Sequence, residues 1–191
     1  MSLTLSKGQK VDLVKDNPGL DNIVLGLGWN PNKGNGADFD LDAFAVLQDA
    51  NKKGLFFGGD RALVYFNQLK SPEGAIQHTG DNLTGEGDGD DEQIKVQLGK
   101  IASDVARISF GANIYKAVER GQSFGQVQDA YIRLFNETTG EEILRYDLSE
   151  DASSANGMVF GSLYLRNGEW KFEADEQVRN GDLFEIFDSF N

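Results

Sequence analysis

The chain has 191 residues, 39% of them hydrophobic, with no cysteine, one histidine and a formal net charge of −13 at pH 7. The lack of cysteine excludes disulfides and thiolate metal sites, and a single histidine excludes centres that need several imidazoles. The negative charge argues against a nucleic-acid-binding protein, because phosphates would be repelled.

The opening residues lack a basic start followed by an apolar block, and no apolar run approaches the ~20 residues needed to cross a bilayer. We therefore expect a soluble, cytoplasmic protein without membrane insertion. Its length and composition predict one domain over residues 1–191.

Apolar and polar residues alternate with a period of two through most of the chain, which predicts a mainly β protein. In chain order, the expected strands cover residues 9–14, 22–30, 38–47, 63–66, 92–98 and 105–115. Two hairpins follow, over residues 130–148 and 158–174. Helix is expected only within residues 115–127 and in the last dozen residues, whose apolar side chains are expected to cover one end of the core. The pattern predicts a β-sandwich of two antiparallel sheets with one or two short helices.

Nine of the 31 acidic residues are concentrated in two short segments. Three lie in "DFDLD" at residues 38–42, and six lie in "GDNLTGEGDGDDE" at residues 80–92. The rest of the chain carries 22 acidic residues against 18 basic ones. The excess negative charge is therefore local, which is unlike a uniformly charged surface.

The first acidic segment runs directly into the apolar stretch "AFAVL". If this segment forms a strand, alternate residues from Phe39 to Leu47 face the core, and Asp38, Asp40 and Asp42 face the other way. Successive aspartates then lie about 6 to 7 Å apart and repel each other by roughly 2 to 3 kcal/mol at an effective dielectric of ~20. Solvation, basic partners or a bound cation can offset this repulsion.

Both segments offer the oxygen ligands that Ca²⁺ takes in proteins: carboxylates, amide and backbone carbonyls, and hydroxyls. The glycines of the second segment allow tight turns that direct carbonyls inward. Because nitrogen and sulfur ligands are scarce, a hard cation is favoured, and Mg²⁺ stays an alternative to Ca²⁺.

The acidic segments allow two other interpretations. An EF-hand loop starting at Asp38 fails at its sixth position, where Ala43 replaces the glycine of the sharp turn. The simpler alternative is a pair of solvated acidic loops that only add solubility. Two such runs with ordered spacing favour the metal site.

At these two segments the sequence closely resembles the TerD family of bacterial tellurium-resistance and stress-response proteins. The resemblance extends over nearly the whole chain and is carried by "LTLSKGQKVDL" at residues 3–13, "FDLDA" at 39–43, "VYFNQ" at 64–68, "GDNLTGEGDGDDE" at 80–92 and the hairpin with Trp170 and Phe172. It implies a β-sandwich that binds two Ca²⁺ ions at loops from the two acidic motifs. It also implies a cytoplasmic stress-response protein whose partners are other TerD-like proteins and a TerC-like membrane protein.

Carried over residue by residue, the resemblance implies a set of oxygen ligands for calcium. They are Asp38, Asp40, Asp42, Asn67, Asp81, Asn82, Thr84, Asp90, Asp91 and Glu92. The family supplies no established catalytic reaction, so we expect no enzymatic activity.

A metal-dependent phosphoryl-transfer or nucleotide-processing enzyme is the alternative function, because "DFDLD" matches the start of some aspartate-nucleophile motifs. In those motifs the aspartates follow an apolar strand, whereas here a polar segment precedes them. Direct binding of tellurium oxyanions is disfavoured, because the site is anionic and thiols are absent. Two further residues are given structural roles only: His78 is expected in an exposed loop, and Arg133 on a solvated strand face.

Overall fold

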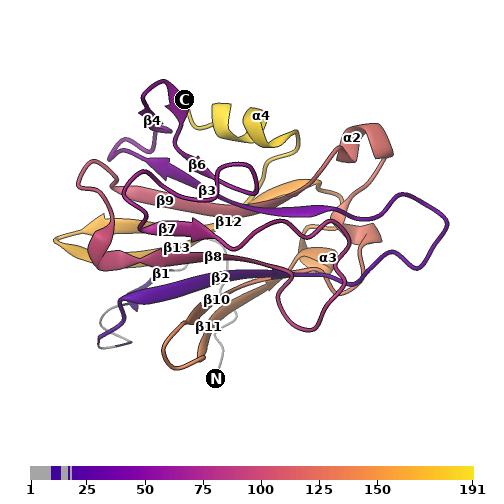
Figure 1. The fold of residues 1–191 in the computed structure, drawn as a ribbon, viewed down its shortest axis with the longest axis horizontal. Helices are drawn as coiled ribbons and strands as arrows, with labels where there is room; N and C mark the ends of the chain where they lie inside the picture. The colour runs from indigo at the N-terminus through magenta and orange to yellow at the C-terminus, as the bar shows by residue number, and fades with distance from the viewer. Residues whose placement is uncertain (1–9, 14–16, 18) are drawn as a thin grey trace.

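The computed structural model describes residues 10–13, 17 and 19–191, and all but two of its strands form two packed antiparallel sheets (Figure 1). The first sheet has the order β1 (Lys10–Val11), β13 (Glu169–Val178), β12 (Gly157–Arg166), β9 (Arg107–Ile114), β3 (Leu41–Gln48) and β6 (Leu63–Val64). The second has the order β11 (Glu142–Asp147), β10 (Tyr131–Asn136), β2 (Asn22–Gly28), β8 (Glu92–Gln97) and β7 (Ile76–His78). The predicted β-sandwich is confirmed.

The main core lies between the sheets and is built from the inward-facing residues of both. Leu25 and Ile94 come from the second sheet and meet Phe110 and Phe172 of the first, all of them fully buried. Alternation along each strand produces this core, because every second side chain points to the same face.

Both faces of β3 are buried, although alternation predicted only one. Its residues Leu41, Ala43, Ala45 and Leu47 face the main core. Phe44 and Val46 face outward into a second, smaller apolar cluster. Helix α4 (Leu183–Asp188) covers that cluster with Leu183, Ile186 and Phe187. The C-terminal helix therefore packs on the outer face of the first sheet, whereas the sequence predicted that it would cover one end of the core.

Both predicted helical segments are present. Residues 115–127 hold α2 (Ala117–Arg120) and the 3₁₀ helix η2 (Phe124–Gln126), and the last dozen residues hold α4. The sequence did not predict α3 (Leu148–Asp151) or the 3₁₀ helix η1 (Leu98–Lys100).

Several strands differ from the prediction. The strand expected at residues 38–47 covers Leu41–Gln48, so Asp38 and Asp40 precede it, and the strands expected at 22–30, 92–98 and 105–115 are each slightly shorter. The expected strand at residues 63–66 ends at Val64. The short hairpin of β4 (Phe56–Phe57) and β5 (Asp60–Arg61) and the strand β7 were not predicted. Of the expected strand at 9–14, β1 is present, while Gln9 and Val14 lie outside the described residues. None of the described helices is both long and apolar enough to cross a bilayer.

Candidate metal centre

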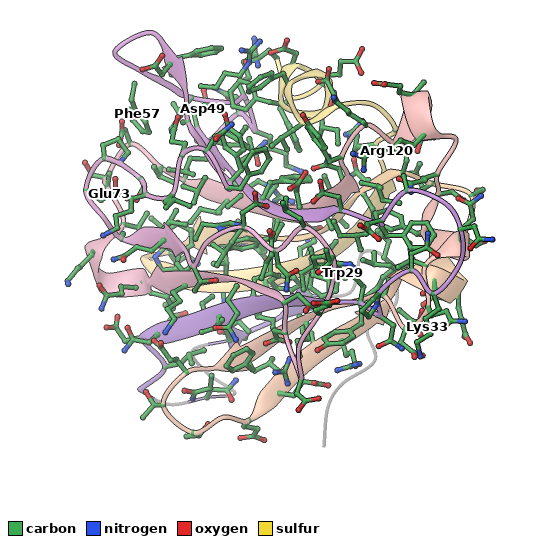
Figure 2. All side chains as sticks on the ribbon, turned by 45° about the vertical axis from the view of Figure 1, so that its right-hand side comes forward. Trp29, Lys33, Asp49, Phe57, Glu73 and Arg120 are labelled. Atoms are coloured by element: carbon green, nitrogen blue, oxygen red, sulfur yellow. The ribbon has the colours of Figure 1, made fainter. Side chains whose placement is uncertain are left out.

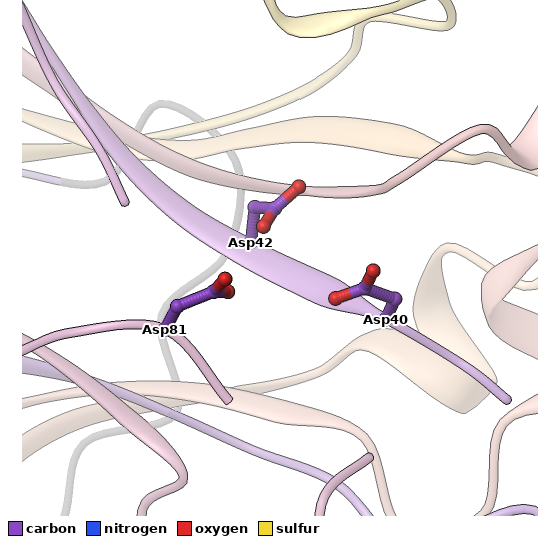
Figure 3. A group of neighbouring side chains, drawn as sticks. All are labelled: Asp40, Asp42 and Asp81. Carbon is purple, nitrogen blue, oxygen red and sulfur yellow. The ribbon is translucent and has the colours of Figure 1, made fainter. Parts of the chain in front are cut away.

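Three aspartates from the two acidic segments meet in the folded chain (Figure 3). Asp40 directly precedes β3, Asp42 is the second residue of that strand, and Asp81 lies in the loop between β7 and β8. One oxygen from each carboxylate lies within 4.8 Å of the other two. In Figure 3 the three carboxylates point toward one common space. The fold thus joins two segments that lie about 40 residues apart, as the sequence predicted.

Two of these carboxylates are buried and have oxygens without a hydrogen-bond partner. Asp42 is 2% exposed and its Oδ2 is unpaired; Asp40 is 7% exposed and its Oδ1 is unpaired. Burial, followed by the charges of Glu92, Asp40 and Asp81, raises the pKa of Asp42 to about 9. Burial and the charge of Asp81 raise the pKa of Asp40 to about 6. Buried acceptors that lack donors destabilise the fold unless a cation or a donor reaches them.

Asn113 adds a fourth oxygen that the sequence analysis missed. It lies on β9 directly opposite Asp42, so the two side chains project from the same face of the sheet. Its side chain is 2% exposed and its Oδ1 has no hydrogen-bond partner. The sequence signal was the single side-chain amide of this strand, but only the strand register places it beside Asp42.

Asp90 is held on the outer face of the second sheet, where it binds basic and polar side chains. Arg133 of β10 contacts it with Nε at 2.8 Å and Nη2 at 2.9 Å, and Tyr131 donates its hydroxyl at 3.0 Å. Burial opposes ionisation, yet the hydrogen bonds from Arg133 and Gln93 hold the pKa of Asp90 below its ordinary value. Arg133 keeps its side chain 26% exposed on this outer face, which agrees with the predicted solvated strand face, and it also pairs with the buried carboxylate of Asp90.

Asp91 fixes the start of the loop that follows β2. Its Oδ2 accepts a hydrogen bond from the backbone amide of Trp29 at 2.9 Å, and its Oδ1 accepts one from Asn82 Nδ2 at 3.0 Å. The indole of Trp29 in turn donates a hydrogen bond to the backbone carbonyl of Phe39 at 2.9 Å. Phe39 is the residue directly before the aspartates of the centre. Figure 2 shows Trp29 well inside the molecule, whereas Lys33 of the same loop lies at its edge.

Glu92 is fully buried and binds three separate segments. Its Oε2 accepts from the Ala43 amide at 2.8 Å and lies 3.2 Å from His78 Nε2, and its Oε1 accepts from the Asn82 amide at 3.2 Å. His78 Nδ1 accepts from the Gly80 amide, which places the ring proton on Nε2, facing Glu92. His78 is thus a buried residue at the end of β7, and its predicted exposed loop position is wrong.

The other expected ligands, Asn82, Thr84, Asp38 and Asn67, are not part of the group of three carboxylates. Asn82 Oδ1 accepts from the amides of Thr84 and Gly85 and so closes the turn. Thr84 Oγ1 accepts from the amide of Glu86. Asp38 is exposed, and its carbonyl accepts from Gln122. Asn67, also exposed, lines a groove together with Asp42 and Asn113.

Within the part of the chain that the structure describes, the carboxylates close enough to share an ion are Asp40, Asp42 and Asp81. Asp90, Asp91 and Glu92 accept hydrogen bonds from other side chains and backbone amides instead, and the full ligand set stays a prediction. Three carboxylates and a nearby amide oxygen suit a hard cation such as Ca²⁺, with water completing its coordination.

Comparison with known proteins identifies relatives along the whole chain. A family model described as TerD domain matches residues 1–190. General stress protein 16U of Bacillus subtilis (strain 168) is 47% identical over 187 residues, which are 97% of this chain and 95% of that protein. Tellurium resistance protein TerD of Serratia marcescens is 48% identical over 186 residues, with coverage of 97% and 95%.

A solved structure supports the fold. The crystal structure of a homologue of telluride resistance protein (TerD), SCO6318 from Streptomyces coelicolor A3(2), superposes with a TM-score of 0.77. It covers 91% of this chain and 99% of that one at 20% sequence identity. The two-sheet architecture is therefore shared despite the low identity.

Proposed function

Because the chain belongs to the TerD family, we propose that it binds Ca²⁺ through Asp40, Asp42 and Asp81 and acts as a metal-ordered interaction module. The observation that carries the proposal is the pair of unpaired, buried oxygens, Asp40 Oδ1 and Asp42 Oδ2, beside a third carboxylate. A divalent ion neutralises two of the three charges and gives these oxygens a ligand.

The ion would connect two parts of the chain that are distant in sequence. Asp40 and Asp42 belong to β3 and the residue before it, and Asp81 belongs to the loop between β7 and β8. Calcium bound to all three therefore fixes that loop against the first sheet. Asn113, opposite Asp42, is the side chain best placed to add an amide oxygen.

The wider role follows from the names of the relatives. They are proteins of tellurium resistance and general stress, and we propose a cytoplasmic protein of the same kind of bacterial system. Other TerD-like proteins and a TerC-like membrane protein are its proposed partners. The proposed role is non-enzymatic, and metal-dependent turnover in a screen of phosphate esters and nucleotides with Mg²⁺ or Mn²⁺ would contradict it.

Isothermal titration calorimetry on chelator-treated protein tests the calcium site. We expect heat of binding for the wild type and loss of most of it in Asp42→Asn and Asp81→Asn. Asp88→Asn is the matched control, because Asp88 is an exposed acid of the same loop outside the group of three. The titration also gives the number of ions, of which the resemblance implies two. No heat at near-millimolar Ca²⁺ would refute the proposal.

A further inference from the structure

Four asparagine–glycine pairs occur in the chain: Asn35–Gly36, Asn156–Gly157, Asn167–Gly168 and Asn180–Gly181. Such a pair is prone to lose its side-chain amide without an enzyme, because glycine has no side chain that shields its backbone nitrogen. That nitrogen attacks the side-chain Cγ of the asparagine, so that a bond between them forms, the bond from Cγ to Nδ2 breaks and ammonia leaves. Water then opens the five-membered imide at either carbonyl. The products are aspartate and isoaspartate, and in isoaspartate the main chain runs through the side chain.

The fold determines which of the four pairs can react. The glycine N–H has to be free to lose its proton, so a hydrogen bond from it to a protein acceptor slows the reaction. The glycine nitrogen must also lie on the same side of the bond between Cα and the carbonyl carbon as the Cβ of the asparagine, because a five-membered ring closes only in that arrangement. A backbone held in another conformation by its neighbours therefore protects its asparagine.

Asn156 and Asn180 protect each other through a reciprocal pair of hydrogen bonds. Asn180 Oδ1 accepts from the backbone amide of Asn156 at 3.0 Å, and Asn156 Oδ1 accepts from the backbone amide of Gly181 at 3.0 Å. The nitrogen that would attack Asn180 is thus engaged as a donor. Gly157, whose nitrogen would attack Asn156, is buried in β12 and pairs with Asn113 of β9. Neither of these two pairs is free to close the ring.

Asn167 and Gly168 form the turn of the hairpin between β12 and β13. Their φ angles are +55° and +81°, and the residues on either side, Arg166 and Glu169, pair with each other in the ladder. Two consecutive residues in the left-handed region are typical of a type I′ turn. In this conformation the glycine nitrogen and the asparagine Cβ lie on opposite sides of the bond between Cα and the carbonyl carbon. Ring closure at Asn167 would therefore require the turn to open.

Asn35 and Gly36 lie exposed in the loop between β2 and β3, outside helices and strands. Within the described part of the chain, neither the Asn35 side chain nor the Gly36 amide has a hydrogen-bond partner. The loop is held just outside this pair, where Asn32 Oδ1 accepts from the Gly34 amide and Asn32 Nδ2 donates to the Ala37 carbonyl, both at 2.9 Å. The pair between these contacts is free to rotate into the reactive arrangement.

We propose that Asn35 is a site of spontaneous deamidation, whereas the fold preserves the other three asparagine amides. Each event consumes one water molecule, releases one ammonia molecule and adds one negative charge three residues before Asp38, the first residue of the acidic segment. The isoaspartate product lengthens the main chain at the exposed tip of the loop. The reaction needs neither calcium nor a partner protein, so it is independent of the proposed function.

Incubation of the full chain at pH 8 and 37 °C in chelator tests the proposal. Tandem mass spectrometry of peptides follows the four asparagines separately, and labelling with protein-isoaspartate methyltransferase and S-adenosylmethionine detects isoaspartate. We expect Asn35 to react at least about tenfold faster than each of the other three, a difference in activation free energy of about 1.4 kcal/mol. In denaturing guanidinium chloride we expect the four rates to converge, because the fold causes the difference. Asn35→Gln, which would need a six-membered ring, is expected to remove the fast reaction.

A second variant tests why Asn180 is protected. Asn156→Ala removes the acceptor of the Gly181 amide and is expected to raise the rate at Asn180 at least about fivefold. Asn51→Ala, the same change at an exposed position of another turn, is expected to leave that rate unchanged. The rate at Asn167 in each sample reports global opening, because general destabilisation would raise it as well. Melting curves establish that both variants are folded.

Four results would overturn the proposal. Deamidation at any of the other three asparagines as fast as at Asn35 in the folded protein would show that the fold does not select this site. A tenfold difference that persists in denaturant would place the cause in the local sequence. An unchanged rate at Asn180 in folded Asn156→Ala would remove the protective role of the reciprocal pair. No deamidation at Asn35 while the denatured chain reacts would show that the loop is protected.

Discussion

The carboxylate of Glu92 on β8 accepts a hydrogen bond from the backbone amide of Ala43 on β3, at 2.8 Å, so that a buried acid joins the two sheets next to Asp42. Its two preceding neighbours make comparable contacts: Asp91 with the Trp29 amide and Asp90 with Arg133. Three consecutive acids thus bind three different parts of the sandwich. These contacts hold the loop that brings Asp81 to the candidate metal centre.

Replacement of Glu92 tests this connection between the two sheets. Glu92→Gln keeps the size of the side chain but removes its charge and gives it donors that face other donors. We expect the free energy of unfolding to fall by about 1.5 to 3 kcal/mol, the range for hydrogen bonds to charged groups. Urea denaturation measures the change, with Glu86→Gln at an exposed position of the preceding loop as the control. Equal stability of the two variants would contradict the assigned role.

Replacement of Asp90 tests whether this residue has a structural role or is a metal ligand. Asp90→Asn takes a charged acceptor from Arg133, and we expect it to lower the free energy of unfolding by about 1.5 to 3 kcal/mol. The rise in melting temperature on addition of Ca²⁺ is expected to persist, because the ion is held by other residues. Thermal melts with and without Ca²⁺ measure both effects. A stable variant that no longer responds to Ca²⁺ would assign Asp90 to the metal.

The pKa of Asp42 predicts how stability depends on pH without metal. Its pKa is raised from 3.8 to about 9 in the folded chain, so the folded state binds the proton more tightly than the unfolded state. The stability gained from this proton is present below about pH 4 and is lost as the pH rises toward about 9. One such group changes the free energy of unfolding by at most about 1.4 kcal/mol per pH unit.

Urea denaturation in chelator at pH 5, 7 and 8.5 measures this slope. We expect Asp42→Asn to flatten it and saturating Ca²⁺ to oppose it, because the ion replaces the proton. A wild-type slope unchanged by the substitution would show that Asp42 does not carry the effect.

Gly85 tests the packing between the second acidic loop and Trp29. It has a φ of +72°, and a Cβ there would lie 2.4 Å from Trp29 Nε1. Gly85→Ala is therefore expected to displace the indole, lower the melting temperature and weaken calcium binding. Gly89→Ala is the control, because φ there is +91° but a Cβ meets nothing within 4 Å. Tryptophan fluorescence measures the displacement of the indole, and calorimetry measures calcium binding. Equal results for the two variants would show that backbone strain, and not contact with Trp29, causes the change.

Alternation in the sequence was enough to predict the two-sheet sandwich and the side of β3 that carries Asp42. It was not enough to predict that Phe44 and Val46, on the same side, are buried, because a helix about 140 residues later covers them. The clustering of negative charge indicated Asp40, Asp42 and Asp81 as candidate metal ligands. It could not separate them from Asp90, whose partner Arg133 becomes its neighbour only when β10 pairs with β2. The place of Asn113 beside Asp42 likewise depends on strand register, which the sequence pattern does not give.

One divalent ion is expected to bind between Asp40, Asp42 and Asp81. An anomalous difference map from crystals grown with calcium chloride would locate this ion. We predict a peak with an oxygen of each of the three carboxylates at about 2.3 to 2.6 Å, the usual calcium–oxygen distance. A well-ordered map with no peak there, and with the three side chains turned away from one another, would show that these aspartates do not form a calcium site.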